Sequence, residues 1–308
     1  MKKFSKMFAL VMSAVMLFGV MTGCAAADKT PTAESLLKGY QEKVQAAEGM
    51  KADCDLDMQM KVSIFGQDEE IKMGGTMNIE SSGENAHIAA NFKMETSEDT
   101  EDVATEMYVM KEGDKFVEYQ CTDGDWTKTS VDGADKIDSM VKNTVVGDPA
   151  KFTMETTDTE YVLKGSISMK EAMDALPEGM LDDVMNSAGG GTDMLTEDMF
   201  AEMGDVPVEY HFSKETKDIV SMNMDMTDAM QKIMDAAIKQ AMSEMGDLEG
   251  VEGMEDFDIT TMFNFNISAM KINMKNMSFE AVNVTLPDEA KNAVEVSAED
   301  FGSLPIGE

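Results

Sequence analysis

Residues 51–64 alternate without exception between polar and apolar side chains. The apolar positions are Ala52, Cys54, Leu56, Met58, Met60, Val62 and Ile64. Because successive side chains of a β-strand point to opposite faces of a sheet, this pattern predicts one long strand with an apolar and a polar face. A chain with such a strand must build a sheet that buries mainly one of its two faces.

Further strands are predicted where the pattern recurs or where β-branched and aromatic residues cluster. They cover residues 71–79, 86–94, 107–110, 115–119, 126–129, 152–156, 161–164, 206–212, 219–226, 263–274 and 279–286. Within 263–274 the apolar positions change parity near Ala269, which predicts a β-bulge. Short turns such as Asp123-Gly124 join several neighbouring strands, so the sheet should be mainly antiparallel.

Four segments carry apolar residues at helical spacing. The first follows Thr32, a residue type favoured as an N-cap, and two others are expected over 136–145 and 228–245. The fourth spans 168–204 and is interrupted by Pro177 and by three consecutive glycines. It predicts two or three short helices that form a lid-like insertion.

The first 24 residues resemble an export signal. Three lysines precede an apolar run at residues 7–20, which is short for a membrane span and suits a signal peptide. The run ends in Met21-Thr22-Gly23-Cys24, a lipobox in which Met replaces the usual Leu. We expect Cys24 to become the acylated N-terminus, and the acyl chains to anchor the protein in a membrane.

These assignments divide the chain into four parts. Residues 1–23 are the signal peptide, and residues 24–33 are the lipidated cysteine and its tether. Residues 34–290 form the folded domain, with 168–204 as its lid-like insertion, and residues 291–308 are a C-terminal tail. The expected location is the extracytoplasmic face of the cell membrane.

Charge excludes one class of partner. The chain carries 60 acidic against 25 basic residues, every one of the latter a lysine, and a formal charge of −35. Nucleic-acid binding requires clustered cations to contact phosphates, so we expect no nucleic-acid partner. A protein partner is left unspecified by the sequence.

Residues suited to catalysis are few, and we expect the protein not to be an enzyme. His87 and His211 occupy polar positions of strands, which predicts solvent exposure. Cys54 lies on an apolar strand face, where thiols are usually inert. Outside the cytoplasm a disulfide between Cys54 and Cys121 is an alternative that the sequence leaves open.

We also expect no metal ion and no other cofactor. Asp53, Asp55 and Asp57 have the spacing of a calcium loop, but Met58 stands where that loop needs glycine. The acidic segment 247–258 is interpreted as a solvated loop.

Methionine is unusually frequent, with 34 residues. Several methionines share one strand face, and thioethers at such spacing can ligate Cu(I). We interpret them instead as the apolar lining of a pocket, because flexible thioether side chains can adapt to ligands of irregular shape. The candidate pocket residues are Leu56, Met58, Met60, Met222, Met224, Met226, Met234 and Ile238.

The order of four segments resembles a known family. They are Met107-Tyr108-Val109-Met110-Lys111-Glu112-Gly113-Asp114-Lys115, Asp123-Gly124-Asp125-Trp126, Val208-Glu209-Tyr210-His211-Phe212-Ser213-Lys214-Glu215-Thr216 and Val284-Thr285-Leu286-Pro287-Asp288-Glu289-Ala290. The arrangement resembles the LolA/LppX-type lipoproteins, and more narrowly a group of uncharacterised Met-rich lipoproteins of Gram-positive bacteria. The resemblance implies an α+β fold, a curved antiparallel half-barrel sheet with helices packed over its concave face. It also implies a Gram-positive cell surface, a cavity for lipids and no catalytic residues.

The leading hypothesis is therefore a non-catalytic, membrane-anchored lipoprotein that binds a lipid or other hydrophobic molecule in a Met-lined cavity. The alternative is a surface interaction or sensory lipoprotein whose core is filled and which has no small-molecule ligand.

Overall fold

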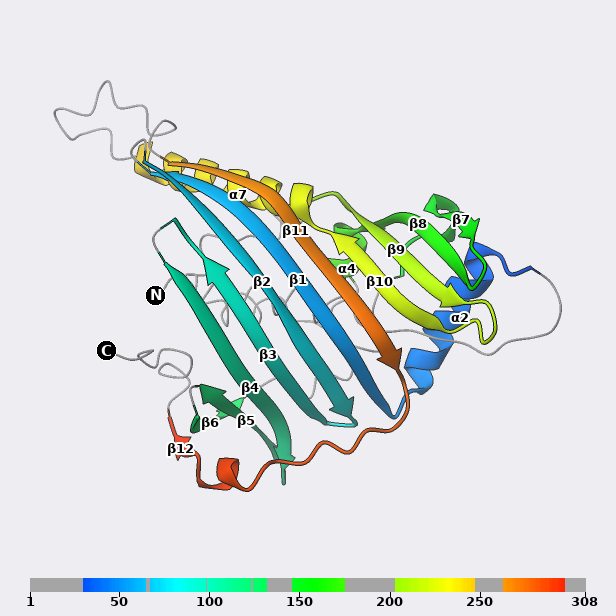
Figure 1. The fold of residues 1–308 in the computed structure, drawn as a ribbon, viewed down its shortest axis with the longest axis horizontal. Coiled ribbons are helices and arrows are strands. Elements are labelled where there is room, and N and C mark those ends of the chain that lie inside the picture. The colour runs from blue at the N-terminus through cyan, green and yellow to red at the C-terminus, as the bar shows by residue number, and fades with distance from the viewer. Residues whose placement is uncertain are drawn as a thin grey trace.

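The computed structural model describes residues 30–64, 67–97, 99–122, 124–131, 146–174, 203–246 and 263–296. They form a mostly-sheet α+β fold with a large, open, curved sheet and few helices (Figure 1). The twelve strands follow the order β12-β6-β5-β4-β3-β2-β1-β11-β10-β9-β8-β7. All neighbours pair antiparallel except β12, which runs parallel to β6, so the predicted antiparallel sheet is confirmed.

The strand bounds follow the predicted pattern closely in most places. The strands are β1 Gly49–Ile64, β2 Gln67–Ser82, β3 Asn85–Glu95, β4 Thr100–Glu112, β5 Lys115–Thr122, β6 Asp125–Val131, β7 Thr153–Thr156, β8 Glu160–Ser168, β9 Asp205–Ser213, β10 Ile219–Asp225, β11 Phe263–Ser278 and β12 Val294–Glu295. The predicted short strand 107–110 is part of the longer β4, because its pairing with β3 continues to Thr100. The predicted bulge is confirmed by a register shift between Gln59/Met60 of β1 and their partners Ala269 and Ile267.

One face of this sheet holds the main core, and we call it the apolar face. It carries Leu56 and Met58 of β1 together with the side chains in register with them on the neighbouring strands. The opposite face, here the polar face, carries Asp53, Asp55 and Asp57. The predicted alternation of β1 is confirmed over residues 51–63, because the apolar positions from Ala52 to Val62 are buried and the polar positions between them are partly or fully exposed.

Helix α2 (Ala33–Ala46) packs on the apolar face. It begins with a capping box, in which the Thr32 side chain accepts a hydrogen bond from the Ser35 N–H and the Ser35 side chain accepts from the Thr32 N–H. Tyr40 lies edge-on to Tyr210 and Phe212 of β9, at ring-centroid distances of 5.7 and 6.0 Å. These contacts hold the helix over the β8–β10 part of the sheet (Figure 1).

Helix α7 (Thr227–Gly246) runs along the edge of β11 where β10 has ended (Figure 1). The Thr227 hydroxyl accepts a hydrogen bond from the Met270 N–H at 2.9 Å. The Gln231 side chain accepts from the Ile267 N–H at 2.7 Å and donates to the Phe265 carbonyl at 3.0 Å. The helix thereby supplies hydrogen-bond partners to a strand edge that would otherwise lack them.

The C-terminal segment corrects two expectations. Residues 279–286 are not a strand, because they leave the sheet after β11 and cross its polar face. Their alternating Val282, Val284 and Leu286 pack against Tyr108 and Tyr119 in a second small core. The short helix η3 (Glu289–Asn292) and β12 follow, so the fold extends past residue 290 into the expected tail.

Several predictions fall outside the described residues. They are the signal peptide 1–23, Cys24, the helix 136–145, the acidic loop 247–258 and most of the insertion 168–204. Of that insertion, the short helix α4 (Met169–Asp174) is described, and the buried Met169 donates its N–H to the Gly204 carbonyl. Among the described helices, none is long and apolar enough to cross a membrane.

Candidate hydrophobic binding face

Methionines from three adjacent strands meet on the apolar face. Met58 of β1 lies opposite Met270 of β11, and Met222 of β10 lies opposite Met274 of β11. The pairing places Leu56, Ile272 and Met224 in one row across the same strands. The sequence predicted which residues of each of these strands share a face. The register between the strands determines which of the methionines are neighbours.

The structure brings seven of the eight candidate pocket residues together. Leu56, Met58, Met60, Met222, Met224 and Met226 are buried, with exposures between 1% and 6%, and Met234 of α7 packs against the same core. Ile238, one turn further along α7, is partly buried and is not among the side chains packed against this core. The Met-lined face is therefore formed by the strands and by the first half of α7.

The alternative of a disulfide between the two remaining cysteines is wrong. Neither Cys54 nor Cys121 forms a disulfide. Register places Cys54 in the row of Met77, Ala90 and Thr105 on the apolar face, whereas Cys121 lies opposite Glu106 on the polar face. Four strand spacings of about 4.8 Å separate β1 from β5, which no disulfide can span.

Cys54 itself is suited to packing and not to reaction. Its side chain is fully buried, and burial raises the pKa of the thiol to about 12. Because the thiolate is the nucleophile, such a thiol is inert at neutral pH, as the sequence predicted.

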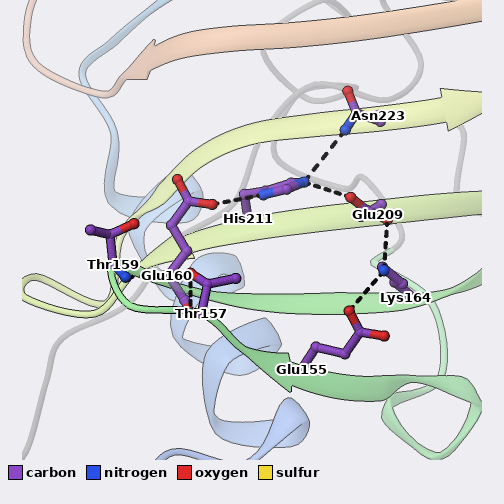
Figure 2. Close-up of polar contacts among 8 residues, drawn as sticks. All are labelled: Glu155, Thr157, Thr159, Glu160, Lys164, Glu209, His211 and Asn223. Atoms are coloured by element: carbon purple, nitrogen blue, oxygen red, sulfur yellow. Dashed lines mark hydrogen bonds and ion pairs between the residues drawn. The ribbon is translucent and has the colours of Figure 1, made fainter.

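The two histidines differ from the expectation of free exposure. His211 of β9 lies between two carboxylates, with Nδ1 at 2.9 Å from Glu160 and Nε2 at 2.8 Å from Glu209 (Figure 2). Lys164 extends this cluster, contacting Glu155 at 2.8 Å and Glu209 at 3.7 Å. The His211 side chain is only 20% exposed, because Glu160 of β8 and Asn223 of β10 on the neighbouring strands contact it. The sequence of β9 alone could not predict these contacts.

His87 repeats this arrangement on β3. Its Nε2 lies 3.0 Å from Glu106, which also accepts a hydrogen bond from the Tyr108 hydroxyl at 2.8 Å. Its Nδ1 lies 3.6 Å from Glu80, and its ring stacks on Tyr108 at 4.2 Å. Each imidazole has its carboxylates at opposite ring nitrogens, a geometry that orients the ring and does not converge on a metal ion. Across the part of the chain that the structure describes, no group of three or more His, Cys, Asp or Glu forms a metal site.

The aspartates of β1 also have local partners. Asp53 accepts hydrogen bonds from Asn276 at 2.7 Å and Asn78 at 2.8 Å, and these bonds lower the pKa of its carboxyl group. Asp55 pairs with Lys275 at 2.5 Å. These contacts join β1 to its neighbours β2 and β11 on the polar face.

Comparison with known proteins assigns the chain to a family of unknown function. Residues 32–255, more than half of the chain, match a family of unknown function, DUF6612. No curated protein matches the sequence. The chain therefore belongs to the DUF6612 family.

Proposed function

We propose that this protein is a non-catalytic lipoprotein, anchored at the extracytoplasmic face of the cell membrane through acylated Cys24. It holds a lipid or other hydrophobic molecule on its Met-lined apolar face, with α2 and α7 over the concave side of the sheet. The observation that carries the proposal is the band of methionines that β1, β10 and β11 align across that face.

Side-chain chemistry explains why this band suits a variable ligand. Methionine has three rotatable bonds and a polarisable sulfur, so a surface lined with it adapts to different apolar shapes. A core built only for stability is usually filled by branched side chains with few rotamers. The curved open sheet and the resemblance to LolA/LppX-type proteins agree with a carrier of hydrophobic molecules.

Native mass spectrometry of residues 28–308 tests the proposal. Every described element begins at Ala33 or later, so this chain retains the whole sheet. We expect the purified protein to carry a hydrophobic adduct that organic solvent releases, and the emptied protein to bind the fluorescent probe N-phenyl-1-naphthylamine. An adduct-free protein that does not bind the probe would overturn the proposal in favour of a filled core that serves a surface interaction.

Leucine variants test the role of the thioethers. Replacing Met58, Met224 and Met270 with leucine keeps the volume of the face and should cost less than about 1.5 kcal/mol per site. We expect this triple variant to bind a narrower range of alkyl chain lengths than the wild type. Met110→Leu is the matched control, because Met110 packs in the second core on the opposite face.

A further inference from the structure

The apolar face changes character at its β5–β6 end. Strand pairing places Glu118 and Gln120 of β5 on this face, beside Thr129 and Thr127 of β6. Both threonines are buried, with exposures of 4% and 7%. The apolar face is lined by methionine on β10, β11 and β1, and it ends in a polar patch on β5 and β6, the fourth and fifth strands from β1.

Glu118 is the acidic group of this patch. It is partly buried, lies opposite Val109 of β4 and Thr129 of β6, and follows the buried Phe116 by two residues. Among the described residues, it makes no hydrogen bond or ion pair. Burial alone raises the pKa of its carboxyl group to about 7, as expected for a carboxylate that has lost water without gaining a partner among the described side chains.

Two lysines on the strands that flank β5 already have partners. Lys111 of β4 pairs with Glu84, and its Nζ lies 5.7 Å from the Phe116 ring centroid. Lys128 of β6 projects from the opposite face, 6.0 Å from the ring centroid of Tyr119. The acidic groups of the opposite face differ from Glu118, because tyrosine hydroxyls donate to them, Tyr108 to Glu106 at 2.8 Å and Tyr119 to Glu112 at 2.5 Å.

An apolar path leads from this carboxyl group to the methionines. Met107, Ile88 and Ile79 form a row across β4, β3 and β2, next to the row of Glu118. The row ends beside Met77 of β2. From β5 to β2 the distance is three strand spacings or about 14 Å, comparable to an extended dodecyl chain.

We propose that the ligand of the apolar face is a cationic amphiphile, whose alkyl chain lies along this path and whose amino head group pairs with Glu118. This inference rests on the proposed function and specifies its ligand class. A cation on the ligand supplies the partner that the described residues do not provide, and a charge-assisted hydrogen bond in a partly dry site is stronger than a neutral one.

Three ligands with the same chain test the head group. Dodecylamine, 1-dodecanol and dodecanoate would each displace N-phenyl-1-naphthylamine from residues 28–308 at pH 8. We expect dodecylamine to bind about tenfold more tightly than 1-dodecanol, and dodecanoate to bind most weakly. In Glu118→Gln the amine and the alcohol should bind within about threefold of each other.

Two further variants separate charge from folding. Glu118→Asp keeps the charge and should keep a preference for the amine. Glu112→Gln removes one charge on the opposite face, leaves an oxygen to accept from Tyr119, and should bind like the wild type. Binding of all three ligands without preference, or an unchanged preference in Glu118→Gln, would overturn the head-group assignment alone. No binding of any dodecyl compound would overturn the proposed function as well.

Discussion

The cost of burying the Glu118 carboxylate predicts that Glu118→Gln stabilises the protein at high pH. The ordinary pKa of a glutamate is 4.5, and burial raises that of Glu118 to about 7. A raised acid pKa means that the folded state binds the proton more tightly than the unfolded state does. The wild type therefore loses stability as the pH rises from about 4.5 to above 7, whereas glutamine has no proton to lose.

The size of the effect follows from the same two pKa values. Each pKa unit corresponds to about 1.4 kcal/mol, so the full cost of ionisation at pH 8 is at most about 3.5 kcal/mol. Because Glu118 is only partly buried, solvent screens part of this cost, and we expect about 1–2 kcal/mol. Well below pH 4.5 the carboxyl group is protonated in both states, and this contribution disappears.

Urea denaturation of residues 28–308 at pH 5 and pH 8 measures this difference. We expect the midpoint of Glu118→Gln to exceed that of the wild type by about 0.5 M at pH 8 and by much less at pH 5. Glu112→Gln controls for the loss of one negative charge from a strongly acidic protein. A stability difference between Glu118→Gln and the wild type that is the same at both pH values would refute the reasoning.

Two further predictions concern α7 and the buried thiol. Gln231→Ala should lower the free energy of unfolding by about 1–3 kcal/mol, because the Ile267 N–H loses the side-chain oxygen that accepts its hydrogen bond. Urea denaturation measures this destabilisation, and faster amide exchange at Ile267 shows where it arises. An equal destabilisation by Gln67→Ala, at an exposed position, would contradict the prediction. In a Cys121→Ser variant of residues 28–308, the single thiol of Cys54 should not react with a disulfide reagent at pH 8 until urea unfolds the chain. Rapid modification of the folded variant would show that the Cys54 strand face opens readily.

Patterns within one segment predicted the local structure well. The alternation of residues 51–64 determined β1 and the side on which each of its residues lies, and the parity change near Ala269 located the bulge. The helical stripe after Asp225 identified α7 to within a residue at each end. Each of these signals depends on the spacing of side chains along one element, which the sequence contains in full.

Patterns that depend on a partner segment were misread. The alternating residues of 279–286 pack on Tyr108 and Tyr119 without joining a ladder, because alternation reports a one-sided environment and does not report strand pairing. The histidines were expected to be exposed, yet Glu106 and Glu160 of neighbouring strands cover them. In the short strands predicted within 107–129, polar and apolar residues do not alternate regularly. The sequence therefore could not predict that Glu118 lies on the apolar face.

The sequence by itself determined that this protein has a one-sided sheet with an acidic, water-facing surface and methionine on the other side. It did so because polarity at a period of two leaves a strand only one way to face the core. Tertiary structure decided which strands are neighbours, and therefore that Met58 meets Met270 and that Glu118 has no cation beside it among the described residues. Register is a relation between segments far apart in the chain, and the charge and burial of a site depend on that relation.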